Sequence, residues 1–137
     1  MQVQTLATIG RIILGLYFLA AGAGKIFNPA PPEQIAHMVV NGVPWPELNF
    51  TLAAACEATA GLCFIIGLHV RLVALLLAAF TVFVSILLHA FWKETGHEAF
   101  IQMMMFMKNI ATAAGILAFA GFGSGPYALD RWFGVKE

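Results

Sequence analysis

Residues 11–25 read RIILGLYFLAAGAGK and decide the fold, because they place permanent cations at both ends of an apolar run. Five residues of this run recur at helical spacing and would share one face of a helix: Arg11, Gly15, Phe18, Gly22 and Lys25. A helix that is apolar on its other faces is typical of a membrane span with its polar face turned toward protein. The two cations would lie about 21 Å apart, within the ~30 Å hydrocarbon layer, so both need partners elsewhere in the chain.

The composition places the chain among membrane proteins. Of its 137 residues, 61% are hydrophobic and 10% are charged, against roughly 45–50% and 25% in soluble domains. Seven Lys and Arg balance seven Asp and Glu, so no excess of positive charge points to nucleic acid. We therefore exclude nucleic-acid binding and expect membrane lipid to surround the protein.

The cysteines and histidines show no pattern typical of a metal or disulfide site. Cys56 and Cys63 would lie about 10 Å apart along one helix, too far for a disulfide. No C-x-x-C motif is present, and the four histidines lack the spacing of metal ligands. We expect the cysteines to be apolar packing residues and expect no metal site.

Four apolar segments predict an all-α integral membrane four-helix bundle that forms one domain over residues 1–137. The expected spans are residues 6–27, 48–68, 72–91 and 101–122, with a polar loop at 92–100. A short helix from Glu33 to Val40 should lie on the membrane surface or over the mouth of the bundle. A cleaved signal peptide is disfavoured, because its removal would take away the cations on which later charges depend.

Four spans place both termini and the His69–Arg71 turn on one side of the membrane. Cations expected on that side are Arg11, Arg71, Arg131 and Lys136, and those expected on the other side are Lys25 and Lys93. Because Lys and Arg are enriched in cytoplasmic loops, we expect cytoplasmic termini.

Glu57 and Lys108 should share one level within the membrane, about 13 Å and about 10 Å below the surface opposite the termini. Leaving either ionised and unpaired would cost at least ~2.5–3.5 kcal/mol, so we expect them to form an ion pair. The remaining residues of the expected ligand site are Lys25, His89 and Asn109 as polar groups, with Phe18, Phe64 and Phe106 lining its apolar part. Such a site would bind a polar headgroup or relay protons, whereas the alternative is an ion-pair network that serves only the architecture.

A second polar cluster is expected on the side of the termini, formed by Arg11, Arg71, Asp130 and Arg131. In this cluster Asp130 would tie the C-terminal tail to Arg71 or Arg11. We interpret this second cluster as mainly structural.

The order and spacing of motifs along nearly the whole chain carry a resemblance to a known family. These motifs are Arg11, Gly15, Phe18, Gly22 and Lys25; Gly42-Val43-Pro44; Glu57, Gly61, Gly67 and Arg71; His89-Ala90-Phe91-Trp92; and Lys108-Asn109, Pro126 and Asp130. In them the chain resembles the DoxX-like family of small four-helix bacterial inner-membrane proteins, of the DoxX/DoxD type. The resemblance implies an oxidoreductase-associated subunit, and without a C-x-x-C motif any redox role would use a quinone or a partner protein.

Three functions are compatible with these residues, and none of them assigns a catalytic residue. The first is a membrane subunit that binds a quinone-like or lipid-like molecule and supports a redox partner, as a quinone-linked oxidoreductase subunit would. The second is a non-catalytic scaffold or assembly factor. The third is a small transporter subunit, which would require a homo-oligomer because four helices enclose little volume.

Overall fold

The computed structural model describes residues 2–28 and 30–134, so Lys136 lies outside the described residues. Four helices are long and apolar enough to cross a membrane: α1 (Gln2–Phe27), α3 (Pro46–Ile66), α4 (Val70–Leu88) and α5 (Gly96–Phe122). Three short helices complete the fold: α2 (Pro32–Val40), the 3₁₀ helix η1 (Phe91–Lys93) and α6 (Leu129–Trp132). The predicted all-α membrane bundle with a short helix between the first two spans is confirmed.

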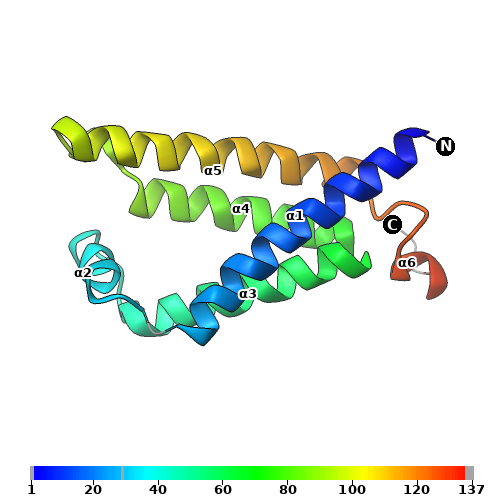
Figure 1. The fold of residues 1–137 in the computed structure, drawn as a ribbon, viewed down its shortest axis with the longest axis horizontal. Coiled ribbons are helices and arrows are strands. Elements are labelled where there is room, and N and C mark those ends of the chain that lie inside the picture. The colour runs from blue at the N-terminus through cyan, green and yellow to red at the C-terminus, as the bar shows by residue number, and fades with distance from the viewer. Residues whose placement is uncertain (1, 29, 135–137) are drawn as a thin grey trace.

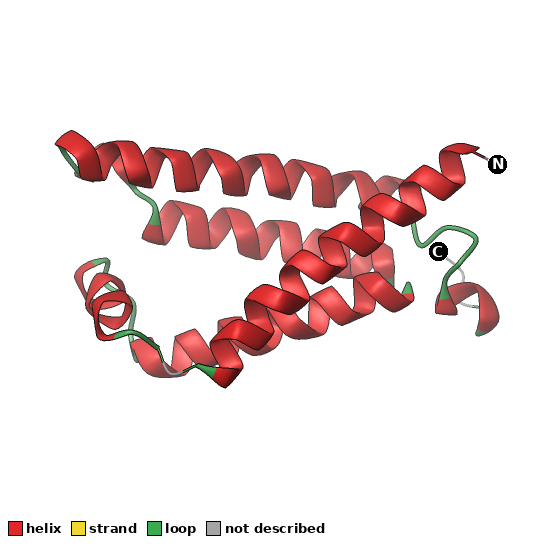
Figure 2. Cartoon of the chain, in the orientation of Figure 1, coloured by secondary structure: helices red, strands yellow, loops and turns green. Residues whose placement is uncertain are grey.

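The long helices form two pairs, with α1 packed on α3 and α4 packed on α5 (Figure 1). The start of α1, the α3–α4 turn and α6 lie at one end of the bundle, which we call the terminal end. Helix α2, η1 and the start of α5 lie at the opposite end, which we call the α2 end. Helices α3 and α4 diverge from their shared turn toward the α2 end (Figure 2), so their backbones are farther apart there.

Glycines allow α1 and α3 to approach each other closely. A Cβ atom added to Gly61 would lie 2.6 Å from the carbonyl oxygen of Gly15, and one added to Gly22 would lie 2.6 Å from that of Ala54. Neither distance is tolerable for real atoms, so larger residues would force the helices apart. Small residues have this role in many membrane helix pairs, where dispersion contacts replace the hydrophobic effect.

The main hydrophobic core fills the space between the two helix pairs. Phe64 of α3 meets Phe119 of α5 edge to face, with ring centroids 5.8 Å apart, and both side chains are buried. Leu77 of α4 and Ile116 of α5 are buried in the same cluster. A second, smaller cluster of Met38, Val43 and Phe50 packs against the end of α4, so α2 lies over the mouth of the bundle rather than apart from it.

The turn between α3 and α4 depends on a glycine. Gly67 has φ +74°, and an added Cβ would approach both Arg11 and Ala128 closer than 3.0 Å. Its carbonyl oxygen accepts a hydrogen bond of 3.1 Å from the amide of Asp130. The turn therefore serves as the attachment point for the C-terminal tail.

The main departure from the expected spans is at the start of α5. Residues 96–100 are helical rather than part of a polar loop: Thr95 is the N-cap residue, without a side-chain capping hydrogen bond, and Glu98 lies in the first turn. Thr and Glu at these positions are a common sequence pattern of helix starts. As a result Glu98 and Gln102 lie on one helical face.

Candidate functional site

A cavity of about 300 Å³ lies between the helix pairs toward the α2 end. Its wall includes residues from all four long helices and from α2. Aromatic rings contribute much of the apolar wall: Tyr17, Phe18, Phe50, Phe80 and Phe83. The divergence of α3 from α4 produces this space, and α2 covers it.

Polar side chains gather at this cavity although each belongs to an apolar span. All five polar residues expected to bind a ligand line it: Lys25, Glu57, His89, Lys108 and Asn109. Lys25 and Glu57 form an ion pair, with their side chains 27% and 13% exposed. Lys108 is exposed and forms no ion pair with another described residue. The cavity therefore presents one neutralised charge pair and one additional cation.

The expected pair of Glu57 with Lys108 is replaced by a pair of Glu57 with Lys25. Side chains on a helix tilt toward its N-terminus, so Lys25 on α1 points back into the bundle while Glu57 on α3 points toward the α2 end. The two side chains therefore converge across the close α1–α3 contact. Helix α5 runs in the same direction as α3 (Figure 1), so Lys108 tilts the same way as Glu57 and remains across the cavity.

His89 belongs to a hydrogen-bonded chain that leads from the cavity to α5. Its Nδ1 lies 2.8 Å from Oε1 of Gln102, and Nε2 of Gln102 donates to Oε1 of Glu98 at 2.6 Å. His89 lines the cavity, whereas Gln102 and Glu98 are not among its lining residues. The hydrogen bonds through Gln102 and Glu98 therefore hold the imidazole ring of His89 by residues that do not line the cavity.

His37 connects the covering helix α2 to the end of α4. Its Nε2 lies 2.7 Å from the carbonyl oxygen of Leu88, the last residue of α4, and can donate a hydrogen bond to it. Carbonyl groups at the end of a helix lack an intrahelical partner, so this contact satisfies one of them. Together with buried Met38, it fixes α2 over the cavity.

The three phenylalanines expected at the site are placed differently from one another. Phe18 lines the cavity. Phe64 is 1% exposed and lies in the main core, away from the cavity wall. Phe106 packs against Phe91 and Trp92, with ring centroids 5.6 and 5.7 Å away, and helps to hold η1.

The second expected cluster forms at the terminal end, but its charges bind backbone groups. Arg11 is 1% exposed and donates to the carbonyl oxygens of Phe64, at 2.6 Å, and Tyr127, at 2.7 Å. The carboxylate of Asp130 accepts from the amides of His69 and Val70 at the start of α4. A carboxylate is favourable there because it satisfies free amides and complements the helix dipole.

Arg71 completes these backbone contacts, whereas Arg131 is exposed. The guanidinium of Arg71 donates to the carbonyl oxygen of Ala120 at 2.9 Å, which joins α4 to the last turn of α5.

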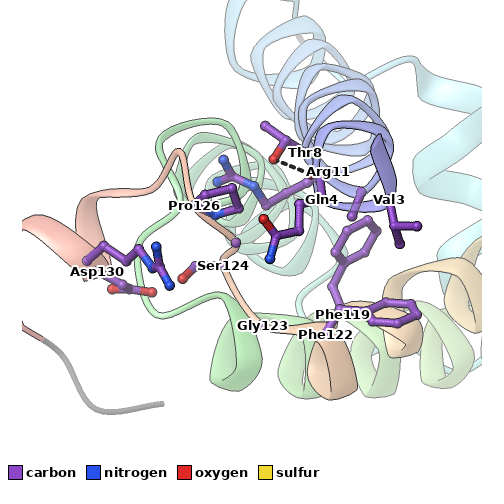
Figure 3. Close-up of a pocket in the computed structure, with 13 residues that line it drawn as sticks. Val3, Gln4, Thr8, Arg11, Phe119, Phe122, Gly123, Ser124, Pro126 and Asp130 are labelled. Atoms are coloured by element: carbon purple, nitrogen blue, oxygen red, sulfur yellow. Dashed lines mark hydrogen bonds between the residues drawn. The ribbon is translucent and has the colours of Figure 1, made fainter. Parts of the chain in front are cut away.

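A pocket of about 450 Å³ adjoins the cluster and is lined by Arg11, Asp130 and Arg131 among others. Figure 3 shows how α1, the end of α5 and the tail surround it. Because Arg11 and Asp130 hold the chain together, we regard the cavity at the α2 end as the stronger functional candidate.

Comparisons with known proteins identify the family. A family model described as DoxX matches residues 6–90. The chain belongs to the DoxX family. It is 34% identical over 128 residues to the inner membrane protein YqjF of Escherichia coli (strain K12), covering 93% of this chain and 92% of that protein. It is 30% identical over 126 residues to the inner membrane protein YphA of the same organism, covering 92% and 89%. No solved structure matches the chain.

For this DoxX protein the family match extends from α1 to just beyond α4. It therefore includes Lys25, Glu57 and His89, which line one side of the cavity. Lys108 and Asn109 on α5 lie outside the matched residues, although the two relatives align over more than nine tenths of the chain. The DoxX protein is thus a membrane protein whose polar cavity combines family-matched helices with α5.

Some wall residues of this DoxX cavity did not stand out in the sequence. His37 is one of four histidines without metal-ligand spacing, and Phe50, Phe80 and Phe83 stand within apolar runs. Phe80, Phe83 and Leu87 are spaced three and four residues apart, so their helical periodicity could have marked one wall. His37 lies on a short helix next to buried Met38, and only the packing of α2 over α4 shows its position.

Proposed function

We propose that this DoxX protein binds the ring of a quinone-like molecule, or a headgroup of similar size and polarity, in the cavity at the α2 end. In this role it would act as an inner-membrane subunit that supports an oxidoreductase partner. The proposal rests on one observation: an aromatic-walled cavity inside a membrane bundle gathers Lys25, Glu57, His89, Lys108 and Asn109 at its surface. Ionisable groups within a membrane span are expensive to bury and usually mark functional pathways.

The size and chemistry of the cavity favour a ring with polar edges. Its volume of about 300 Å³ lies at the lower end of small-molecule sites, which suits a headgroup whose apolar tail remains in lipid. Aromatic side chains provide flat apolar surfaces for offset or edge-to-face ring contacts. Lys108 and Asn109 supply hydrogen-bond donors on one wall, and carbonyl or anionic oxygens are their natural partners.

Ligand retention tests this proposal directly. The protein purified in mild detergent should carry a stoichiometric quinone or lipid that native mass spectrometry and solvent extraction detect. Ala53→Trp would place an indole in the cavity wall and should abolish this ligand. Ala55→Trp is the matched control, because Ala55 is exposed on the same helix and does not line the cavity. A folded wild-type protein without any bound quinone or lipid would contradict the proposal.

A second candidate function is a membrane scaffold whose charges serve folding alone. The terminal end favours it, because Arg11, Arg71 and Asp130 bind backbone groups of their own chain there. Under this function the double variant Glu57→Gln with Lys108→Met should still copurify with its partner protein. Loss of the partner from a folded double variant would argue for a ligand-dependent role.

We also propose that the terminal end faces the cytoplasm. The names of the two E. coli relatives place those proteins in the inner membrane and say nothing of their orientation. Arg11, Arg71 and Arg131 lie at this end, whereas Lys25 and Lys93 lie toward the α2 end. Because Lys and Arg favour the cytoplasmic side, a C-terminal green fluorescent protein fusion should fluoresce. Activity of a C-terminal alkaline phosphatase fusion, which requires the periplasm, would reverse the orientation.

A further inference from the structure

The hydrogen-bond partners of His89 determine which of its ring nitrogens carries a proton. Glu98 is exposed in the first turn of α5, where negative charge is favoured. An ionised carboxylate only accepts hydrogen bonds, so the NH₂ group of Gln102 must face Glu98, 2.6 Å away. The amide oxygen of Gln102 is then the group that meets His89 at 2.8 Å. An oxygen acceptor at Nδ1 requires that Nδ1 carry the hydrogen.

A neutral imidazole with a proton on Nδ1 has a free lone pair on Nε2. The two nitrogens flank Cε1 of the ring and point in different directions, and Nδ1 contacts Gln102, which is not among the lining residues of the cavity. No described residue forms a hydrogen bond with Nε2 of His89, although His89 itself lines the cavity. His89 therefore carries, beside the cavity, an acceptor that the described residues leave unused.

Among the other polar groups on the cavity wall, Lys108 can only donate hydrogen bonds, whereas the amide side chain of Asn109 both donates and accepts. The carboxylate of Glu57 is already engaged by Lys25. A ligand with only carbonyl oxygens would satisfy the donors and leave Nε2 of His89 without a partner. Burying a polar atom without a hydrogen bond costs free energy, so a ligand hydroxyl at this position is favoured.

We propose that Gln102 and Glu98 are positioning residues that hold His89 with its proton on Nδ1, so that Nε2 selects a ligand carrying a hydroxyl group. The selection rests on the proposed ring-binding function, whereas the positioning of His89 does not. In terms of substrate class, the cavity prefers a hydroquinone or phenolic ring over a ring that bears only carbonyl or ether oxygens.

The positioning is tested without any ligand by nitrogen-15 NMR of the full protein labelled at histidine and held in micelles. A His89→Gln variant assigns the resonances of His89 among those of the four histidines. In the wild type, Nδ1 should show the protonated shift and Nε2 the unprotonated shift. Glu98→Gln replaces a group that only accepts by an amide that can also donate, so Gln102 can adopt either orientation and the variant should give a mixture of tautomers. Exchanging the two groups, by Glu98→Gln with Gln102→Glu, restores an acceptor at position 102 and should restore the Nδ1–H form.

The selection is tested with two probes, decylubiquinol and its dimethyl ether, under anaerobic conditions. The wild type should bind the quinol more tightly than the ether, and His89→Phe should reduce this ratio roughly three- to ten-fold, as expected for one neutral hydrogen bond. Gln102→Leu should reduce it less, because part of the His89 population keeps the correct tautomer. The ratio corrects for any general loss of binding caused by a variant.

The outcomes separate the two proposals. A wild-type His89 that carries its proton on Nε2 overturns the positioning, whatever the protein binds. The expected tautomer together with an unchanged quinol-to-ether ratio in His89→Phe overturns the selection. The expected tautomer in a protein that binds neither probe overturns the ring-binding function while the positioning stands. Agreement in both measurements supports the inference.

Discussion

Arg11 at the terminal end and Lys108 at the α2 end are both cations within membrane helices, but their surroundings are opposite. Arg11 is 1% exposed and donates to two backbone carbonyls from α3 and the tail. Lys108 lines a cavity and has no ion-pair partner in the described part of the chain. The charge of Arg11 therefore stabilises the fold, whereas the charge of Lys108 remains available to bind a ligand. This contrast separates structural from functional charge within one small bundle.

The architecture gives a reason for the contrast. At the terminal end the α3–α4 turn, α1 and the tail converge, so backbone groups that need partners lie close to charged side chains. At the α2 end α3 and α4 have diverged, and the side chains between them face a cavity instead. Substitutions at the two ends should therefore affect different properties.

Replacing Arg11 by Met should cause the largest loss of stability, about 2–4 kcal/mol. The substitution leaves the carbonyl oxygens of Phe64 and Tyr127 without their charged donor in a buried place. Thermal unfolding in detergent, followed by circular dichroism, measures the change. Arg131→Met is the control, because exposed Arg131 should contribute less than about 0.5 kcal/mol. Equal losses in both variants would remove the distinction between the two ends.

Replacing Asp130 by Ala should cost about 1–2 kcal/mol, a loss typical of a helix N-cap. The carboxylate bonds the amides of His69 and Val70, so its removal frees the start of α4 and loosens the tail. Asp130→Asn keeps one acceptor oxygen and should lose about half as much. Faster hydrogen exchange at Val70 would locate the effect, and an unaltered α4 start would contradict it.

Replacing Glu57 by Gln should cost about 1 kcal/mol, since a partly exposed ion pair stabilises less than a buried contact to the backbone. A double-mutant cycle with Lys25→Met isolates the pair, because removing both partners should cost no more than removing one. Unfolding in detergent measures stability, and native mass spectrometry measures ligand retention. A loss as large as that of Arg11→Met would show that the α2 end is also structural.

The sequence predicted the fold well because apolar length, proline breaks and short connections act locally. The seam of Arg11, Gly15 and Gly22 also marked the face of α1 that packs against α3, since helical spacing fixes which residues share a face. The start of α5 was placed too late because the polar residues before Phe100 obscured a helix start at Thr95. Polarity alone does not distinguish a loop from the first turn of a helix.

The candidate site was harder to predict because the depth of a residue in the membrane does not determine the direction of its side chain. Glu57 and Lys108 were matched by level, but Lys25 reaches Glu57 because their side chains tilt toward each other on antiparallel helices. Including that tilt would have favoured Lys25 over Lys108 as the ion-pair partner of Glu57. The acceptor role that we propose for His89 depends on contacts with Gln102 and Glu98, and only the full course of α5 shows these contacts.

Replacing Lys108 by Met should have the smallest effect on stability, within about 0.5 kcal/mol, because an exposed side chain without a partner adds little to folding. Its effect should appear in ligand retention, since the variant removes the cation that the cavity offers to a ligand oxygen. Native mass spectrometry of both proteins compares the bound fraction, and Lys93→Met controls for loss of a cation outside the cavity wall. Full retention of the ligand by a stable Lys108→Met protein would mean that the charge of Lys108 does not contribute to ligand binding. The contrast with Arg11 would then concern folding alone.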